Sequence, residues 1–260
     1  MTRGNAPIHW VLLDETGGAA CQNGETLSPE ALSKIAEAVS MQLARDWGSD
    51  SSARAGSGPT DIMPGERVYT FKNGLPEAPG AIAYHSVDGS GVEFGMEDIT
   101  SCSSLYGDGA SASSAFSHEA IETEGDRGCN GWSDDGQGTL HANERCDAIE
   151  VQGYTVTTSD GTVVTVSNFL LDSWFIPGAP APYTYMTANG LAGGVEPPGP
   201  MQVAAGDGGN YDSVEPAPTT GSQVFGFVNA GKQIRGTPRN PKKAAHWSSR
   251  AYKRGHRLKP

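Results

Sequence analysis

The chain has 260 residues, of which 37% are hydrophobic, enough for one medium-sized domain with an apolar core, or for one domain and an extension. Glycine (35) and proline (17) make up about a fifth of the residues and aromatic residues only 8%, so fibrous proteins, coiled coils and helical bundles are excluded. No apolar run approaches the roughly 18 residues of a membrane span, and Asp14 and Glu15 interrupt the pattern that a signal peptide would need. We therefore expect neither a membrane segment nor a secretory leader.

The net charge of -12 is divided unevenly along the chain. Residues 232–260 contain ten basic and no acidic side chains, so residues 1–231 carry a charge of -22. The acidic part should repel nucleic acid and attract cations, whereas the basic tail can contact phosphate groups or an acidic protein surface. Trp247 and Tyr252 in the tail permit stacking on nucleic acid, but docking on an acidic neighbouring subunit is the favoured interpretation.

The first elements in chain order are predicted to be a strand and an amphipathic helix. Residues 8–13 form a short apolar run rich in strand formers, typical of a buried strand. Ser28, Pro29 and Glu30 then have the pattern of a helix cap and first turn. Apolar residues recur at helical spacing as far as Leu43, which predicts a helix that ends near residues 47–48.

The next part of the chain is predicted to add strands and a second helix. Residues 49–65 are small and polar and predict a loop. Three short strands are predicted after it, at residues 67–71, 81–85 and 92–96. Residues 101–114 are low in complexity and predict a mobile segment, followed by a helix over 116–125 capped by Ser113 or Ser114. These elements together predict a mixed sheet with one covered face.

The remainder of the chain is predicted to contain a hairpin and long loops. Residues 154–158 and 162–166 alternate in polarity and flank a Ser-Asp-Gly turn, which indicates a β-hairpin. The stretch 177–220 is rich in proline and glycine, and 224–228 can form a last strand. We therefore divide the chain as follows: an α+β domain over 1–176, a Gly/Pro-rich loop region over 177–231 and a basic tail over 232–260.

The second predicted helix carries the clearest chemical motif. His118 and Glu122 stand one turn apart, so both can bind one metal ion, and Glu119 beside them can hold a metal-bound water. A divalent ion lowers the pKa of its water to about 7, and a neighbouring carboxylate can take the proton as the water attacks a carbonyl. Glu144, which follows Glu122 after 21 intervening residues, offers a third carboxylate ligand.

Residues 118–150 resemble zincin-type metallopeptidases, in particular the zincin-like proteins of bacteria and phages with a His-Glu-x-x-Glu motif, a later Asp, a Gly-Trp pair and a Glu-x-x-Asp segment. The resemblance covers roughly residues 8–175. It implies a zincin-like α+β fold, in which a mixed β-sheet is combined with a long N-terminal helix and a metal-site helix. The roles that it implies are metal ligation by His118, Glu122 and Glu144, a general base at Glu119, and Asp147 as the alternative third ligand or as a support for the ligands.

The implied ligand set departs from the usual pair of histidines. Several carboxylates with one imidazole make a harder site, which is compatible with Zn²⁺ but shifts the balance towards manganese, calcium or an empty site. Asp126 can join this site only if the helix ends at Gly125 and the chain turns back.

Other residues are weaker candidates for the site. His141 is an alternative to Glu144, and Cys129 and Cys146, which we expect to be reduced, can be combined with histidines into a zinc site of unusual spacing. His85, at the end of a predicted strand, can touch a substrate beside the cleft, but we interpret it as a capping or surface histidine.

Two functions from different classes follow from these observations. The first is a peptidase or amidase of phage origin that depends on Zn²⁺ or another divalent cation and acts on a protein or peptide substrate. The alternative is a non-catalytic virion subunit, a head or tail component, that keeps the fold and assembles with neighbouring subunits through its loops and basic tail. Either protein is expected in the host cytoplasm or the virion, without membrane contact and with nucleic acid contacted through the tail alone.

Overall fold

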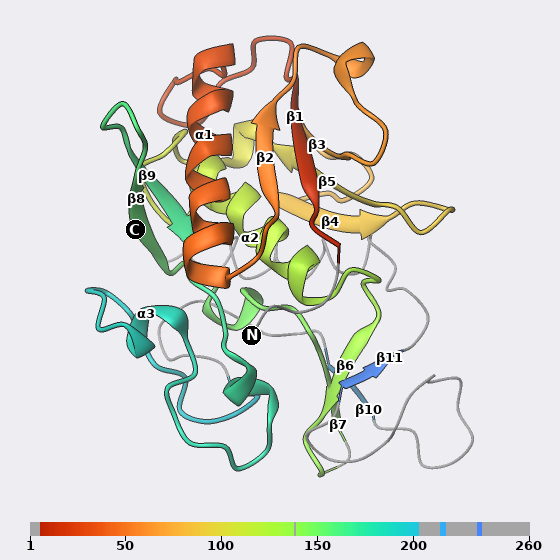
Figure 1. The fold of residues 1–260 in the computed structure, drawn as a ribbon, viewed down its shortest axis with the longest axis vertical. Coiled ribbons are helices and arrows are strands. Elements are labelled where there is room, and N and C mark those ends of the chain that lie inside the picture. The colour runs from red at the N-terminus through yellow and green to blue at the C-terminus, as the bar shows by residue number, and fades with distance from the viewer. Residues whose placement is uncertain (1–5, 138, 203–213, 217–232, 236–260) are drawn as a thin grey trace.

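A five-stranded mixed sheet organises the first half of the chain (Figure 1). The computed structural model describes residues 6–137, 139–202, 214–216 and 233–235. The strands of this sheet, in spatial order, are β2 (Ser52–Ala55), β1 (His9–Glu15), β3 (Arg67–Lys72), β5 (Glu93–Asp98) and β4 (Ala83–Val87). Neighbouring strands are parallel except for β4, which is antiparallel to β5. The prediction of an α+β protein with a mixed sheet is therefore confirmed.

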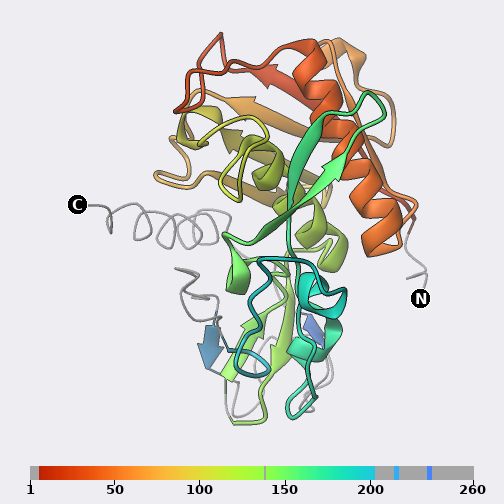
Figure 2. The ribbon, with the colours of Figure 1, turned by 90° about the vertical axis from the view of Figure 1, so that its left-hand side faces the viewer.

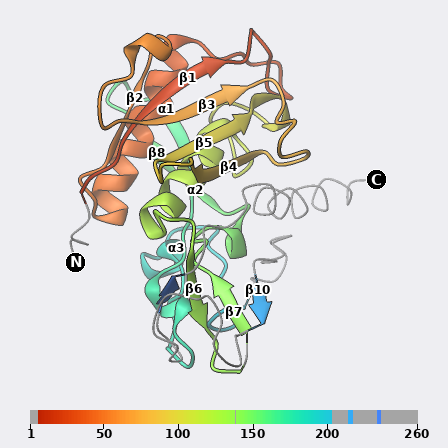
Figure 3. The ribbon, with the colours of Figure 1, turned by 90° about the vertical axis from the view of Figure 1, so that its right-hand side faces the viewer.

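Two helices lie on the same face of this sheet (Figures 1 and 3). The first, α1 (Pro29–Gln42), continues into a π-helical turn over Leu43–Trp47 and ends at Gly48 in a left-handed conformation. Its N-cap is Ser28, whose side chain accepts a hydrogen bond from the backbone N–H of Ala31, so the predicted cap is confirmed. The second helix, α2 (Ala112–Gly125), lies between the sheet, α1 and the strand β9 described below.

An aromatic cluster joins the sheet to α2. Trp10 of β1 makes edge contacts with Tyr69 of β3 and Phe116 of α2, and Tyr69 also packs against Phe116 with ring centroids 4.5 Å apart. All three side chains are buried in the main apolar core. Burial of such large apolar surfaces is the main force that holds α2 against the sheet.

The structure corrects two predictions about loops. The predicted loop 49–65 contains β2, whose four residues are all half-buried beside β1, with the N–H of Ala53 bonded to Ser40 of α1. The predicted mobile segment 101–114 instead packs into the core, with Cys102 and Leu105 buried. The cap of α2 is Ser111, two residues before the nearer of the two expected caps, and the helix begins at Ala112. In both cases tertiary contacts, rather than apolar periodicity, order a small and polar sequence.

The second half of the chain forms smaller units, of which a four-stranded sheet lies below the first sheet and a hairpin lies beside α1 (Figures 1 and 2). A four-stranded antiparallel sheet has the order β10 (Val214–Pro216), β7 (Thr139–Ala142), β6 (Gly131–Asp134) and β11 (Gln233–Arg235). The predicted hairpin is confirmed as β8 (Gly153–Thr157) and β9 (Val163–Ser167). Short 3-10 helices cover Pro59–Asp61, Ile99–Ser101, Asp147–Ile149 and Asp172–Phe175, and α3 covers Tyr185–Ala188.

Two predictions concern parts of the chain beyond these elements. The predicted strand at 224–228 and residues 236–260 of the basic tail lie outside the described residues, whereas Gln233–Arg235 at the start of the tail forms β11. Among the described helices, none combines the length and the apolar character that a membrane crossing requires.

Candidate metal centre

The helix α2 carries most of the site and is unusual in what it buries. All but two of its fourteen residues are buried, because the sheet, α1 and β9 surround it. Its apolar residues, including Phe116 and Ile121, pack into the main core. The buried residues also include His118, Glu119 and Glu122, so the helix presents an imidazole and two carboxylates to the interior rather than to solvent.

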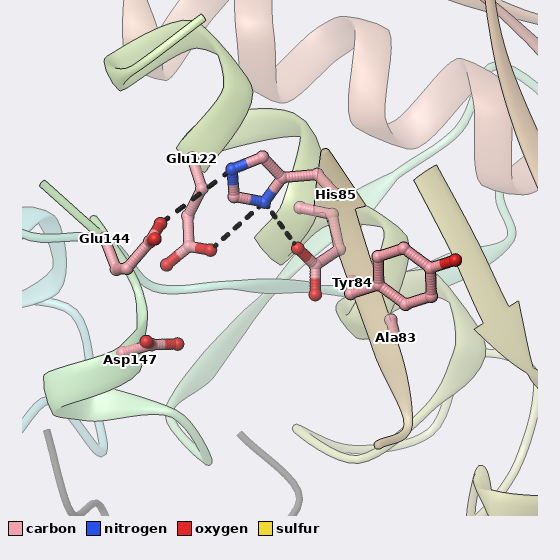
Figure 4. A pocket seen from close by; sticks show the side chains of 7 residues that line it. Ala83, Tyr84, His85, Glu122, Glu144 and Asp147 are labelled. Carbon is pink, nitrogen blue, oxygen red and sulfur yellow. Dashed lines mark hydrogen bonds and ion pairs between the residues drawn. The ribbon is translucent and has the colours of Figure 1, made fainter. Parts of the chain in front are cut away.

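Glu119 and Glu122 border a pocket between β4, α2 and the segment 144–147 (Figure 4). The empty space of the pocket, which includes a part open to solvent, is about 260 Å³. Its lining residues are Ala83, Tyr84, His85, Glu119, Glu122, Glu144 and Asp147. The structure therefore brings Glu119, Glu122, Glu144 and Asp147, all selected from the sequence, to one place.

The first group of potential ligands consists of His118, Glu122 and Asp147. Nε2 of His118 lies 3.3 Å from Oε1 of Glu122 and 3.2 Å from Oδ1 of Asp147. Two ligands bonded to one tetrahedral ion at about 2.0–2.1 Å lie roughly 3.3–3.4 Å from each other. One ligand atom from each of the three residues falls within 4.8 Å of the others, so the group could hold a metal ion. In this group the third position is taken by Asp147 and not by Glu144.

The segment that carries Glu144 and Asp147 is fixed to the end of α2. The backbone N–H of Cys146 donates a 3.0 Å hydrogen bond to Oε1 of Glu122. The neighbouring Arg145 is fully buried and lies against Gly125, where an added Cβ would come within 2.7 Å of the arginine side chain. Glycine at this position therefore allows the close approach that sets Asp147 beside His118.

The second group of potential ligands consists of His85, Glu119 and Glu122. Nδ1 of His85 lies 2.8 Å from Oε2 of Glu119 and 3.6 Å from Oε2 of Glu122 (Figure 4). On the other side of the ring, Nε2 lies 3.9 Å from Oε2 of Glu144. These three residues also fall within 4.8 Å of one another and could hold a metal ion. The interpretation of His85 as a surface or capping residue is wrong, because its side chain is only 5% exposed and faces the pocket.

Burial and mutual repulsion shift the proton affinities in the site. Burial raises the pKa of Glu122, assisted by the charges of Asp147 and Glu144, although His118 opposes this effect. Burial also raises the pKa of Glu150, again with a contribution from Asp147. Burial alone would lower the pKa of His118, but the neighbouring Glu122 and other groups raise it well above its usual value. Protons and metal ions therefore compete for the oxygen atoms of these crowded carboxylates.

His85 is affected in the same manner as His118. Burial works to lower its pKa, but the side chains of Cys129, Glu119 and Glu144 around the ring raise it well above the usual value. Both histidines of the site therefore lie in surroundings that favour a positive charge on, or next to, the ring.

The remaining candidates from the sequence lie outside both groups. The helix does end at Gly125, but the carboxylate of Asp126 then accepts the N–H of Gly131 at 2.7 Å and shapes the turn into β6. His141 lies 3.7 Å from Asp135 on the β6–β7 hairpin. All four cysteines are buried and free, as expected, and among the described residues neither group of ligands includes one.

Comparison of the chain with known proteins provides no independent guide to this site: no family model, no curated protein and no solved structure matches it. The interpretation of the site therefore depends on its own geometry and chemistry.

Proposed function

We propose that this protein is a zincin-like, metal-dependent hydrolase that cleaves peptide or amide bonds with Zn²⁺ or another divalent cation. The observation that carries the proposal is the spacing of His118, Glu122 and Asp147. Nε2 of His118 lies 3.3 Å from the carboxylate of Glu122 and 3.2 Å from that of Asp147, the separation expected around one tetrahedral ion. Both carboxylates line the pocket.

The donor set fits a divalent cation. Imidazole nitrogens and carboxylate oxygens are both ligands of zinc, and three protein ligands leave a coordination position open for water or substrate. A cation bound here would supply Lewis acidity, which polarises a carbonyl group and makes a water molecule more acidic. The remaining requirement is a base that can accept the proton of that water.

Glu119 has the position of such a base. It precedes Glu122 by three residues on α2, lines the same pocket and is 5% exposed. Its Oε2 is held by Nδ1 of His85 at 2.8 Å, which fixes the orientation of the carboxylate. General base catalysis needs a carboxylate at a defined place near the reacting water, and this hydrogen bond provides one.

The position of β4 supports a peptide substrate. Among the described strands β4 is the last of its sheet, and its residues Ala83, Tyr84 and His85 line the pocket. An extended peptide that ran alongside this edge strand would pass the proposed cation, as in other complexes where a peptide adds to a sheet.

The test is hydrolysis by the purified protein after removal of metal and reloading with Zn²⁺ or Mn²⁺. We expect cleavage of casein or of mixed fluorogenic peptides by the reloaded wild type. Glu119→Gln should lower the rate by about 10²–10⁴-fold, the usual contribution of a general base, and should retain the metal. His118→Ala should lose both metal and activity.

Glu30→Gln is the matched control, because Glu30 is an exposed glutamate of α1 whose ion pair with Lys34 lies outside the pocket. This variant should keep full activity. A wild-type protein that holds no metal and cleaves nothing would contradict the proposal and leave the non-catalytic virion subunit as the better interpretation.

A further inference from the structure

Glu122 faces a different histidine with each of its two carboxylate oxygens. Oε1 lies 3.3 Å from Nε2 of His118, and Oε2 lies 3.6 Å from Nδ1 of His85. A carboxylate arranged in this way can bridge two cations, which in two-metal sites lie about 3.5–4 Å apart. The two groups of potential ligands are therefore not alternatives, since they can be occupied together through Glu122.

The ligand atoms on the side of His85 converge in a buried place. The side chains of His85, Glu119 and Glu122 are 5%, 6% and 3% exposed. The two distances from Nδ1 of His85, 2.8 and 3.6 Å, bracket the roughly 3.3 Å that separates two ligands of a tetrahedral ion. The opposite nitrogen, Nε2, faces Oε2 of Glu144 at 3.9 Å, so a further carboxylate lies beside this place.

The charge of the pocket is the second reason to expect another cation. Four carboxylates line it, and one divalent cation would neutralise only two of them. Within the described part of the chain, Glu119, Glu122 and Asp147 form ion pairs with histidines alone. A histidine supplies at most one positive charge, and buried carboxylates are costly unless their charge is balanced, so a second divalent cation, in place of a proton on His85, would balance more of this negative charge.

We propose that a second divalent cation binds to His85, Glu119 and Glu122, and that this cation inhibits the hydrolase. The position is weaker than the first, because a cation must replace the 2.8 Å hydrogen bond between His85 and Glu119 and share Glu122 with the first ion. One imidazole and two carboxylates suit Zn²⁺ or Mn²⁺.

Inhibition is expected because Glu119 is both the proposed general base and a ligand of the second cation. A carboxylate oxygen that is bonded to a cation is a poor acceptor for a proton, so an ion in the second position withdraws the base that the reaction needs. Only this part of the inference rests on the proposed function. Activity should rise as the first cation binds and fall as the second binds.

The first experiment counts cations without reference to activity. Metal-free protein is titrated with Mn²⁺ and with Zn²⁺, and bound metal is measured by calorimetry and by elemental analysis after dialysis. We expect two ions per chain, one tight and one weaker, and a magnetic interaction between two bound Mn²⁺ ions in electron paramagnetic resonance. His85→Ala and His85→Gln should lose the weaker ion and keep the tight one, whereas His118→Ala should lose the tight one.

His141→Ala is the matched control, because His141 is a buried histidine outside both groups. The His141→Ala protein should still bind both ions. Circular dichroism and thermal unfolding identify any variant that fails to fold, and the two substitutions of His85 guard against the failure of one. A single ion per chain at saturation, or two ions in both His85 variants, would overturn the proposal.

The second experiment measures hydrolysis over the same titration. The wild type should lose activity as the second ion binds, and the residual activity of His85→Gln should not fall over that range. Two bound ions without hydrolysis at any loading would refute the hydrolase and keep the second position. Hydrolysis with one bound ion and no second ion would keep the hydrolase and refute the second position. A protein that binds no cation would refute the hydrolase and the second position alike.

Discussion

The helices α1 and α2 have the same length and the same kind of cap, but they bury different side chains. Each has fourteen residues and a serine N-cap. The buried residues of α1 are apolar except for Gln42, whereas α2 also buries His118 and three glutamates. Apolar burial is enough to explain the place of α1, but buried carboxylates oppose folding unless they are neutralised. The difference fits the proposal that α2 holds a cation as well as packing against the sheet.

The largest expected effect is a loss of stability on truncating the buried apolar residues that both helices contribute to the core. Ile35 of α1 and Ile121 of α2 are both fully buried in the main core. Ile35→Ala and Ile121→Ala should each lower the free energy of unfolding by about 2–5 kcal/mol, because each leaves a cavity. Urea unfolding measures both values. The two losses should be similar and unaffected by a chelator; a loss at Ile121 that disappeared without metal would break the comparison.

The next effect, stabilisation by a bound cation, should depend on α2 and not on α1. A cation that binds only the folded protein stabilises it by about 2.7 kcal/mol when its free concentration is 100 times the Kd. Saturation with Zn²⁺ should therefore raise the free energy of unfolding of the wild type and of Ile35→Ala equally. His118→Ala should show little of this gain. Equal stabilisation of His118→Ala would show that zinc acts somewhere other than on α2.

A buried carboxylate outside both groups sharpens the comparison. Glu97 of β5 is fully buried, and its partners are the hydroxyl of Tyr69 at 2.9 Å and the thiol of Cys102 at 3.1 Å. Burial raises its pKa well above the usual value, and the charge of Glu119 adds to the effect. Glu97 is therefore a test of what burial does to a carboxylate that no histidine neutralises.

The expected pH dependence follows from the direction of that shift. As pH rises above the usual glutamate pKa of about 4.3, the unfolded chain loses the proton that folded Glu97 retains, so the stability falls. This single group contributes a slope of up to about 1.4 kcal/mol per pH unit between its two pKa values. Glu97→Gln should remove that slope when unfolding is measured from pH 5 to 8. An unchanged slope would show that Glu97 ionises normally.

The smallest effect should again be common to both helices. The Ser28 hydroxyl accepts the N–H of Ala31, and the Ser111 hydroxyl accepts the N–H of Ser114. Ser28→Ala and Ser111→Ala should each cost about 1 kcal/mol of stability, with or without metal. Chemical unfolding of the two variants gives the values, and a metal-dependent loss at Ser111 would link its cap to the site.

Much of the fold could be predicted because local signals agreed with the tertiary structure. The apolar run of β1, the cap and apolar spacing of α1 and the turn between β8 and β9 each follow from chemistry within a few residues. The strand β2 has no such signal, because its sequence Ser-Ala-Arg-Ala becomes a strand only by pairing with β1. Its register is set by a neighbour that is distant in sequence.

The same distinction holds for the site. Helical spacing predicts that His118, Glu119 and Glu122 lie together, since these residues share adjacent turns of one helix. The contribution of His85 depends on β4 being the strand of the sheet nearest to the pocket, and the order of strands is not encoded in local spacing. The choice between Glu144 and Asp147 beside His118 likewise depends on how the segment after β7 meets the end of α2.

The central claim is that the buried polar side of α2 is a cation site. The most direct measurement is an anomalous difference map from crystals of the protein grown with Zn²⁺, with data collected on both sides of the zinc absorption edge. The account predicts a peak in bonding contact with Nε2 of His118 and with the carboxylates of Glu122 and Asp147. A map without a peak between these three groups at saturating zinc would contradict it.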